Sequence, residues 1–483
     1  MAPTLSLRET RFFVRNVRTR MPFQYGAATL TSVPILHVQG QVETGDGARA
    51  EAWAADILPP KWFDKDPAKE YSDNVADLVA GARAAAAAYV EASRQPGTVF
   101  GIWREASTRC QVEGEAAGRN HLTSGHGSSL MERLLIDGLG RALGRPYHDL
   151  VRADLLGLDF GCLLPELAGA PPAAAIAPHP LDQLYVRHTV GLADPVRSAD
   201  IPPDERLADG LPQSLEEYVL VQGIQYVKIK VGGDHRADIE RLSLIASVLD
   251  NSGADYRATL DGNEQYRDME GFHALLHALS SEPRLGSLYE RILYIEQPLE
   301  RSLALDPGQE PGIRLAAEHR PMLIDESDGD LDCFRRAVDL GYTGVSSKNC
   351  KGLIKALANQ ALARHLTTAG KGPYFLSGED LMNLPVVPLH QDLAHLACLG
   401  ISHAERNGHH YVRGLDHLTP SERGACLEWH GDLYEGTAEA ANLAVRDGRI
   451  RLPSLQCPGL GVAVEVDAGA MTPLDDWRFE SLA

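Results

Sequence analysis

Hydrophobic and polar positions along the first fifty residues follow the pattern of β-strands. Residues 32–42 are rich in β-branched and apolar side chains, and this run ends at a turn signal, TGDG, at residues 44–47. From about residue 66 to residue 150 the apolar residues recur at helical spacing instead. The leucines of residues 130–143 continue one helical face, and Gly144 ends that helix. The pattern of the N-terminal part therefore predicts strands followed by helices.

Residues 184–410 follow a different pattern, in which a short β-rich run, polar residues and an amphipathic helix succeed one another repeatedly. An Ala/Pro-rich stretch at residues 168–180 separates this part from the first. The predicted strands are residues 185–190, 225–231, 256–261, 291–296, 321–326, 344–348, 373–378 and 396–403. Eight strands that alternate with helices are typical of a (β/α) barrel. An open, doubly wound sheet is disfavoured because neither G-x-G-x-x-G after an early strand nor G-x-x-x-x-G-K-[ST] occurs.

The charge balance narrows the choice of partners. Of the 483 residues, 46 are Lys or Arg and 66 are Asp or Glu, which gives a net charge of −20. An acidic surface repels the phosphates of nucleic acids and anionic lipids, so neither nucleic acid nor a membrane is an expected partner. The hydrophobic fraction of 44% is that of a globular protein, and a chain of this length is expected to form two domains.

The cysteine pattern and the first residues bear on the compartment. Seven cysteines are scattered along the chain without a C-x-x-C pair, so the sequence indicates neither a disulfide framework nor a thiolate zinc site. The start, MAPTLSLRETRFF, lacks the apolar core of a secretory signal. The most apolar stretch, residues 82–90, contains Arg83 and is too short to span a bilayer. We therefore expect a cytoplasmic protein.

Charged residues occupy the carboxyl-terminal ends of five consecutive predicted strands. In a (β/α) barrel these ends build the active site, so charged residues at these positions favour a catalytic role. The strand-end residues are Lys228 and Lys230 on the second strand, Asp261 on the third, Glu296 on the fourth, Asp325 followed by Glu326 on the fifth, and Lys348 on the sixth. The two lysines of the second strand share one face because they are two residues apart.

These residue types together suit one kind of chemistry. Three carboxylates that converge on one point repel one another unless a cation joins them, and all-oxygen ligands favour Mg²⁺. A lysine has a usual pKa of about 10.4, and partial burial and a second ammonium group lower it, so that one lysine can act as a base. The set fits removal of a proton next to a substrate carboxylate, with lysines on the two faces of a planar enediolate and the metal neutralising its charge.

Each of these residues also has an ordinary structural explanation. A lone Asp at a strand end caps the next turn, and a single K-x-K is typical of a solvated edge. The spacing favours a site, because 31, 35, 29 and 23 residues separate Lys230, Asp261, Glu296, Asp325 and Lys348 in turn. Each interval is close to one strand–helix unit, as a rim of consecutive strands requires.

The sequence resembles the enolase superfamily, specifically the muconate-lactonizing-enzyme branch of the mandelate racemase/muconate lactonizing enzyme family. The matching segments of the barrel are YVKIKVG (226–232), LDGNEQY (260–266), YIEQPLE (294–300), LIDES (323–327) and VSSKNCKG (345–352). Outside the barrel, residues 22–32 resemble the mobile capping loop, residues 131–151 the helix before the barrel, and residues 448–467 the segment that returns to the cap. The resemblance extends over nearly the whole chain.

The resemblance implies an α/β fold: a modified (β/α)8 TIM-type barrel, (β/α)7β, with an α+β capping domain. We expect the capping domain at residues 1–165 with its mobile loop at 22–32, a linker at 166–183, and the barrel with the active site at 184–430. Residues 431–483 are expected to return to the capping domain. A homo-oligomer is expected from the resemblance alone.

The resemblance also assigns roles. Asp261, Glu296 and Asp325 would bind Mg²⁺. Lys230 would be the base on one face of the substrate, and Lys348 would be the acid or base on the other. Lys228 would lower the pKa of Lys230 and contact the substrate carboxylate. Further candidates, as partners of the ligands or as substrate-binding groups, are Asn263, Glu326, Glu379, His403, Phe23 and Tyr25.

The chain departs from the family pattern in length and in one motif. Excess residues lie in four connecting segments, near 160–183, 194–214, 280–290 and 302–320, and such insertions can reshape the mouth of a pocket. The sixth-strand motif lacks the expected paired glycines, so Lys351 competes with Lys348, which we prefer because it ends the apolar run. No His–Asp dyad stands out on the sixth and seventh strands, which argues against a mandelate-racemase type of base.

We therefore expect an enzyme that uses Mg²⁺ and abstracts the α-proton of a small carboxylate substrate. The outcome would be racemisation or epimerisation, or cycloisomerisation. Two alternatives stay open. An acid-sugar dehydratase would use the same site for elimination of water, and a catalytically silent barrel would act as a binding or assembly module.

Overall fold

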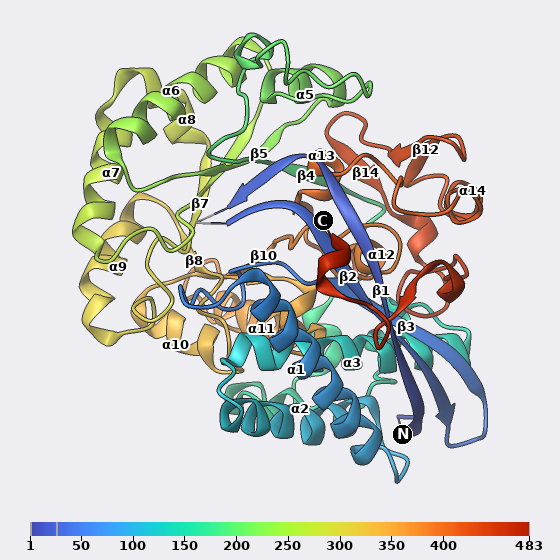
Figure 1. Cartoon of the computed structure of the whole chain (residues 1–483). Coiled ribbons are helices and arrows are strands. Elements are labelled where there is room, and N and C mark those ends of the chain that lie inside the picture. The colour runs from blue at the N-terminus through green and yellow to red at the C-terminus, as the bar shows by residue number, and fades with distance from the viewer. Residues whose placement is uncertain (1, 26–27, 483) are drawn as a thin grey trace.

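The computed structural model describes residues 2–25 and 28–482, which form a capping unit and a barrel (Figure 1). The capping unit begins with three long antiparallel strands, β1 (Leu5–Tyr25), β2 (Ala28–Thr44) and β3 (Arg49–Ile57). Four helices follow: α1 (Tyr71–Ala92), α2 (Val99–Ala116), α3 (His121–Leu143) and α4 (Tyr147–Arg152). The predicted change from strands to helices is confirmed, and Gly144 ends α3 in a left-handed conformation with φ 63°.

Helix α3 packs directly against the sheet of the capping unit. A Cβ atom at Gly138 would lie 2.4 Å from Val42 and 3.2 Å from Ala52, so only glycine allows this close approach. Leu130, Leu134, Leu135 and Leu139 of the same helix are fully buried. The leucine face predicted from the sequence is therefore the face that forms the core of the capping unit.

Eight parallel strands close into a barrel. They are β4 (Gln183–Val190), β5 (Tyr226–Lys230), β6 (Arg257–Asp261), β7 (Ile292–Glu296), β8 (Met322–Ile324), β9 (Gly344–Ser347), β10 (Phe375–Gly378) and β11 (His403–Arg406). Each strand pairs with the next along the chain, and β11 pairs with β4, which closes the ring. These strands are buried on both faces, as their continuous apolar runs require.

Helices join the barrel strands on the outside of the ring. Those between the strands are α5 (Leu215–Gln222), α6 (His235–Asn251), α7 (Met269–Ser281), α8 (Gly286–Arg291), α9 (Glu310–His319), α10 (Cys333–Leu340), α11 (Leu353–Thr368) and α12 (Val387–Leu399). Helices α13 (Gly408–Tyr411) and α14 (Pro420–Trp429) follow the last strand. Because β11 ends the alternation, the predicted fold class, a (β/α)7β barrel with a capping domain, is confirmed.

The eighth predicted strand is misplaced. The apolar residues 396–399 end helix α12, Gly400 follows with φ 82°, and the strand begins only at His403. Every residue of helix α12 is buried, including the polar His390, Gln391 and Asp392, so its apolar residues do not mark a single buried face. A short apolar run of this kind does not distinguish a buried helix from a strand.

The last part of the chain contacts both units. Strand β14 (Arg449–Arg451) pairs antiparallel with β4 of the barrel, and β12 (Tyr434–Gly436) pairs with β13 (Ala441–Leu443). Strand β15 (Thr472–Pro473) then pairs with β1, so this part of the chain lies against the capping sheet. Within the described residues, no helix is both long enough and apolar enough to cross a membrane.

Candidate active site

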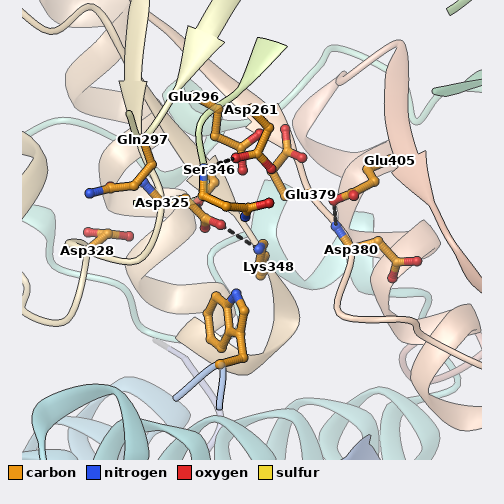
Figure 2. A network of polar contacts seen from close by, with 12 residues as sticks. Asp261, Glu296, Gln297, Asp325, Asp328, Ser346, Lys348, Glu379, Asp380 and Glu405 are labelled. Atoms are coloured by element: carbon orange, nitrogen blue, oxygen red, sulfur yellow. Dashed lines mark hydrogen bonds and ion pairs between the residues drawn. The ribbon is translucent and has the colours of Figure 1, made fainter. Parts of the chain in front are cut away.

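Two lysines face each other across the carboxyl-terminal rim of the barrel. Lys230 ends β5, and Lys348 directly follows β9. These strands lie four places apart in a closed ring of eight, so they stand on opposite sides of the barrel. The three strands between them, β6, β7 and β8, deliver Asp261, Glu296 and Asp325 to the same rim (Figure 2).

Lys228 lies at the centre of a ring of carboxylates. Its Nζ atom is 2.7 Å from Glu296 Oε2, 2.7 Å from Glu379 Oε2, 3.0 Å from Asp261 Oδ2 and 3.1 Å from Glu405 Oε2. These residues come from β6, β7, β11 and the end of β10, that is, from both halves of the barrel. Burial alone would lower the pKa of Lys228, but the four carboxylates outweigh it and raise that pKa well above its usual value.

Lys230 pairs with the first of the predicted metal ligands. Its Nζ atom is 2.5 Å from Asp261 Oδ2, the oxygen that also contacts Lys228. Burial raises the pKa of Asp261, but the two lysines prevail and lower it below its usual value. The backbone N–H of Asn263 donates to Asp261 Oδ1 at 2.8 Å. Asn263 thus lies beside the carboxylate, where the sequence places it.

Lys348 and Lys351 both hold Asp325 but differ in their access to the cavity. Lys348 Nζ is 2.6 Å from Asp325 Oδ2, and Lys351 Nζ is 3.0 Å from Asp325 Oδ1. Only Lys348 lines the cavity at the rim, where its ammonium lies 4.5 Å from the centre of the Trp62 ring. Lys351 instead points to Asp328 and Ser346. This geometry favours Lys348 as the lysine that meets a substrate.

The donor set fits a hard cation. Burial, together with the carboxylates of Asp261, Glu379 and Asp325, raises the pKa of Glu296 well above its usual value. Its Oε2 atom receives no hydrogen bond of good geometry, although Lys228 Nζ lies near. A buried carboxylate among other carboxylates is stabilised by a divalent cation, and ligands that are all oxygen suit Mg²⁺.

The three predicted ligands end neighbouring strands, but the structure does not bring their oxygens together as one ligand group, and only Asp261 of the three lines the cavity. In the described part of the chain, three candidate ligand atoms lie within 4.8 Å of one another only at Asp330, Asp332 and Cys333, beyond the end of β8. At the rim, Asp261 contacts two lysines, and Asp325 contacts Lys348 and Lys351. The distances between the rim carboxylates are therefore set by ion pairs with ammonium groups.

A cavity opens directly above this rim, and its walls are of two kinds. The barrel supplies charged and polar residues, and the capping unit supplies apolar ones. The cap residues are Phe23, Leu30, Ile57, Pro59 and Trp62, and the loop after β10 adds Leu381 and Met382. The ring of Phe23 stacks on Tyr411 with 4.1 Å between the centroids. Phe23 thus lines the cavity, as predicted.

The other predicted substrate-binding residues lie elsewhere. His403 begins β11 rather than ending it, so it sits in the barrel interior away from the rim. There Arg187 Nη1 lies 2.9 Å from His403 Nδ1, and the histidine stacks on Tyr226. The prediction that His403 binds substrate is wrong, because it rests on the misplaced eighth strand. The side chain of Tyr25, and residues 26–27 of the predicted capping loop, lie outside the described part of the structure.

Glu379 contacts Lys228, and Glu326 follows Asp325, but neither lines the cavity. Glu379 accepts hydrogen bonds from Lys228 and from Arg187, so it balances buried charge and does not line the cavity. Glu326 follows Asp325, and burial with the nearby Asp325 and Glu264 carboxylates raises its pKa to about 7. Neither residue faces the space that a substrate would occupy.

Three residues that shape the site escape sequence reasoning. Trp62 comes from the segment after β3, far along the chain from the lysine it covers. Asn407 follows β11, whose position the sequence pattern misplaces. Arg187 lies inside β4, where a charged residue reads as an interruption of the apolar run. Only a strand-end rule applied to a correctly placed β11 could have found Asn407.

The long segment after β4, residues 191–214, binds the capping strand that carries Phe23. Arg20 of β1 pairs with Asp209 through two contacts, 2.6 Å from Nε to Oδ2 and 3.0 Å from Nη2 to Oδ1. Arg20 Nη1 also donates to Pro212 O at 3.0 Å and His410 O at 3.1 Å. The predicted insertion, residues 194–214, lies within this segment and contacts the strand that carries Phe23.

Comparison with known proteins identifies the fold. No family model and no curated protein sequence matches the chain. Among solved structures, a mandelate racemase/muconate lactonizing protein from Herpetosiphon aurantiacus is similar at 17% identity and a TM-score of 0.59, covering 95% of this chain and 99% of that one. 2-Chloromuconate cycloisomerase from Rhodococcus opacus is 13% identical with a TM-score of 0.61, and the match covers 96% of this chain and 98% of that one. A dipeptide epimerase from Enterococcus faecalis is 15% identical with a TM-score of 0.60, and the match covers 94% of this chain and 99% of that one. The chain therefore has the capped, modified barrel fold of the mandelate racemase/muconate lactonizing enzymes of the enolase superfamily.

Proposed function

We propose that the protein is a Mg²⁺-dependent enzyme that removes the α-proton of a carboxylate substrate, with racemisation, epimerisation or cycloisomerisation as the outcome. One observation carries this proposal: Lys230 and Lys348 come from opposite sides of the barrel and line the same cavity. A planar carbon between two such groups can lose a proton on one face and regain one on the other.

Each residue of the rim has a part in this reaction. Lys230 takes the α-proton at its Nζ atom, and the substrate becomes a planar enediolate. Lys348, as an ammonium group, donates a proton to the opposite face of the same carbon. Asp261, Glu296 and Asp325 would hold Mg²⁺, which supplies positive charge next to the substrate carboxylate. Trp62 and Phe23 exclude water from the reacting carbon, since both line the cavity.

The solved structures support the general type of activity. The dipeptide epimerase is described as complexed with Mg and the dipeptide L-Leu-L-Tyr, and an enolase from Bradyrhizobium as complexed with magnesium and mandelic acid. Both names concern carboxylate ligands and the same metal. The rival reaction is dehydration of acid sugars. It is disfavoured because the cap side chains that line the cavity are apolar and offer few hydrogen-bonding groups to the hydroxyls of a sugar.

The proposal is tested by incorporation of deuterium at the α-carbon. A library of carboxylates is incubated with the enzyme and Mg²⁺ in deuterated water and read by mass spectrometry. We expect incorporation into at least one acid, reduced about a thousandfold in Lys230→Ala for the enantiomer whose α-proton Lys230 takes. Incorporation is expected to be unchanged in the control Lys371→Ala, whose lysine is exposed on the loop after α11. Equal incorporation by wild type and Lys230→Ala into both enantiomers would refute the proposal, and no incorporation into any acid would favour the silent barrel.

A further inference from the structure

One segment of the cap, residues 58–66, lies over Lys348. It follows β3 and carries Trp62, which is buried and lines the cavity. The centre of the Trp62 ring is 4.5 Å from the ammonium group of Lys348, and the face of a tryptophan ring attracts such a cation. The position of this segment therefore decides what Lys348 contacts on the side of the cap.

Arg301, on the loop after β7, binds the backbone of this segment at two consecutive residues. Its Nη2 atom donates to Trp62 O at 2.9 Å, and its Nη1 atom donates to Phe63 O at 3.0 Å. Because the guanidinium group is planar and rigid, two such hydrogen bonds fix the orientation of the segment on the barrel. Asn120, which precedes α3 of the cap, also donates to Phe63 O, at 2.9 Å.

Glu264, on the loop after β6, holds Arg301 from the barrel. Glu264 Oε1 accepts from Arg301 Nε and from the backbone N–H of Arg301, and Oε2 accepts from Nη2, each at 2.8 Å. Lys65 of the cap segment forms an ion pair with the same carboxylate. Arg301, Glu264 and Lys65 thus form a clamp between the cap segment and the barrel.

The backbone at the base of the clamp is strained. Asn263 and Glu264 have φ values of 44° and 65°, in the left-handed region that residues with a Cβ atom rarely adopt. Such conformations persist where the surrounding contacts hold them, and they cluster at functional sites. The contacts of Glu264 with Arg301 and Lys65 supply this hold, and Asn263 lines the cavity. The strain and the clamp therefore belong to one feature beside the site.

We infer that Arg301 is a positioning residue, which acts with Glu264 and Lys65 to hold Trp62 over Lys348. The clamp thereby sets the geometry of proton transfer on the face of the substrate that Lys348 serves. Lys230 pairs with Asp261, outside the clamp, so the opposite face does not depend on it. The placement of Trp62 is independent of the proposed function, whereas the effect on proton transfer rests on it.

Hydroxyl-radical footprinting, read at each tryptophan by mass spectrometry, tests the placement of Trp62 without turnover. Trp103 is 4% exposed in the cap and Trp429 is 59% exposed, so they serve as the protected and the accessible reference. In Arg301→Ala the oxidation of Trp62 is expected to rise about fivefold relative to Trp429, with Trp103 unchanged. Arg301→Lys keeps the charge but not the paired donors, so it is expected to show a smaller rise. If Arg301→Ala does not fold, Arg301→Lys gives the comparison.

The matched control is Arg141→Ala. The side chain of Arg141 is 26% exposed, against 23% for Arg301, and it likewise joins a carboxylate, Asp137, to a backbone oxygen, Val462 O. Arg141 lies on α3 and does not line the cavity. Trp62 is therefore expected to stay protected in this variant.

Deuterium incorporation into separate enantiomers tests the effect on proton transfer. Arg301→Ala is expected to slow incorporation into the enantiomer whose α-proton Lys348 takes about tenfold more than into the other enantiomer. The inference is overturned if Trp62 stays protected in both Arg301 variants, if Trp62 and Trp103 become accessible together, or if both enantiomers slow equally. If wild type incorporates no deuterium into any acid, the proposed reaction is refuted, and the footprint still decides whether Arg301 holds Trp62.

Discussion

The buried charges at the rim decide which side chains are free to act. Lys228 contacts four carboxylates and is only 1% exposed, so it acts as a fixed counter-charge. Removing one partner of such a buried set leaves an uncompensated charge, which is far more destabilising than loss of an exposed pair. Lys230 and Lys348 each pair with one carboxylate and also line the cavity, which leaves them able to meet a ligand.

Metal binding is the first prediction at the scale of single residues. Asp261→Asn removes an anionic oxygen ligand while conserving shape, so we expect the Kd for Mg²⁺ to rise at least about tenfold, which corresponds to about 1.4 kcal/mol. Isothermal titration calorimetry measures this value. Asp330→Asn is the control, because Asp330 belongs to the acidic group beyond β8. A rise for Asp330→Asn with none for Asp261→Asn would place the cation at that group instead of the rim.

Glu132 gives a prediction about pH. This buried residue of α3 accepts a hydrogen bond from the backbone N–H of Leu353 at the start of α11 and so joins the cap to the barrel. Burial raises its pKa from 4.5 to about 7. The folded state therefore keeps the proton that the unfolded state has lost, and the stability that this group contributes is present below pH 4.5 and is lost as the pH rises to 7.

Glu132→Gln cannot ionise and keeps the acceptor oxygen. Relative to wild type, its free energy of unfolding is expected to rise by about 3 kcal/mol between pH 4.5 and pH 8. Urea denaturation of both proteins at the two pH values measures this change. The prediction fails if the difference between variant and wild type is the same at both values.

At the scale of elements, the segment 191–214 holds β1 in place over the cavity. Asp209→Asn weakens the paired contacts to Arg20. We expect faster amide hydrogen exchange at residues 20–24 and weaker binding of a substrate-like acid, by about fivefold, with an unchanged melting temperature. Asp200→Asn is the control, since Asp200 pairs with Arg197 on the surface of the same segment. Equal effects of the two substitutions would show that the Arg20 contacts do not position the strand.

The sequence pattern predicts elements well where an apolar run has a clear period and a clear end. Strands β5 and β6 end at Lys230 and Asp261, as their alternating or continuous apolar runs indicate. Helix α12 is buried on every side, so its end cannot be distinguished from a strand by sequence alone. Because β11 is misplaced in the prediction, Asn407 is not recognised as a residue that follows a strand end, and His403 is assigned to the end of β11 that it does not occupy.

The candidate site is predictable in the barrel and unpredictable in the cap. Strand-end residues share a rim because neighbouring parallel strands end together, which is a property of the fold class. Trp62 and Phe23 reach the cavity only through the way in which the cap is seated on the barrel. Such long-range packing leaves no local signal in the chain, so it cannot be read from spacing or periodicity.

At the scale of the whole molecule, the cavity exists only where cap and barrel meet. The barrel supplies the lysines and carboxylates, and the cap supplies the apolar wall. In Figure 1 the long strands of the cap, drawn in blue, extend toward the mouth of the barrel, and β15 near the C-terminus pairs with β1. The site is therefore a product of the tertiary arrangement rather than of either unit by itself.

The central claim is that Lys230 and Lys348 act on one carbon from opposite faces. Deuterium incorporation into the separate enantiomers of a carboxylate that wild type exchanges tests this claim most directly. We predict that Lys230→Ala loses exchange with one enantiomer and retains it with the other, and that Lys348→Ala shows the reverse pattern. If both variants lose the same enantiomer, or if neither loses any exchange, then the two lysines do not face each other across the substrate.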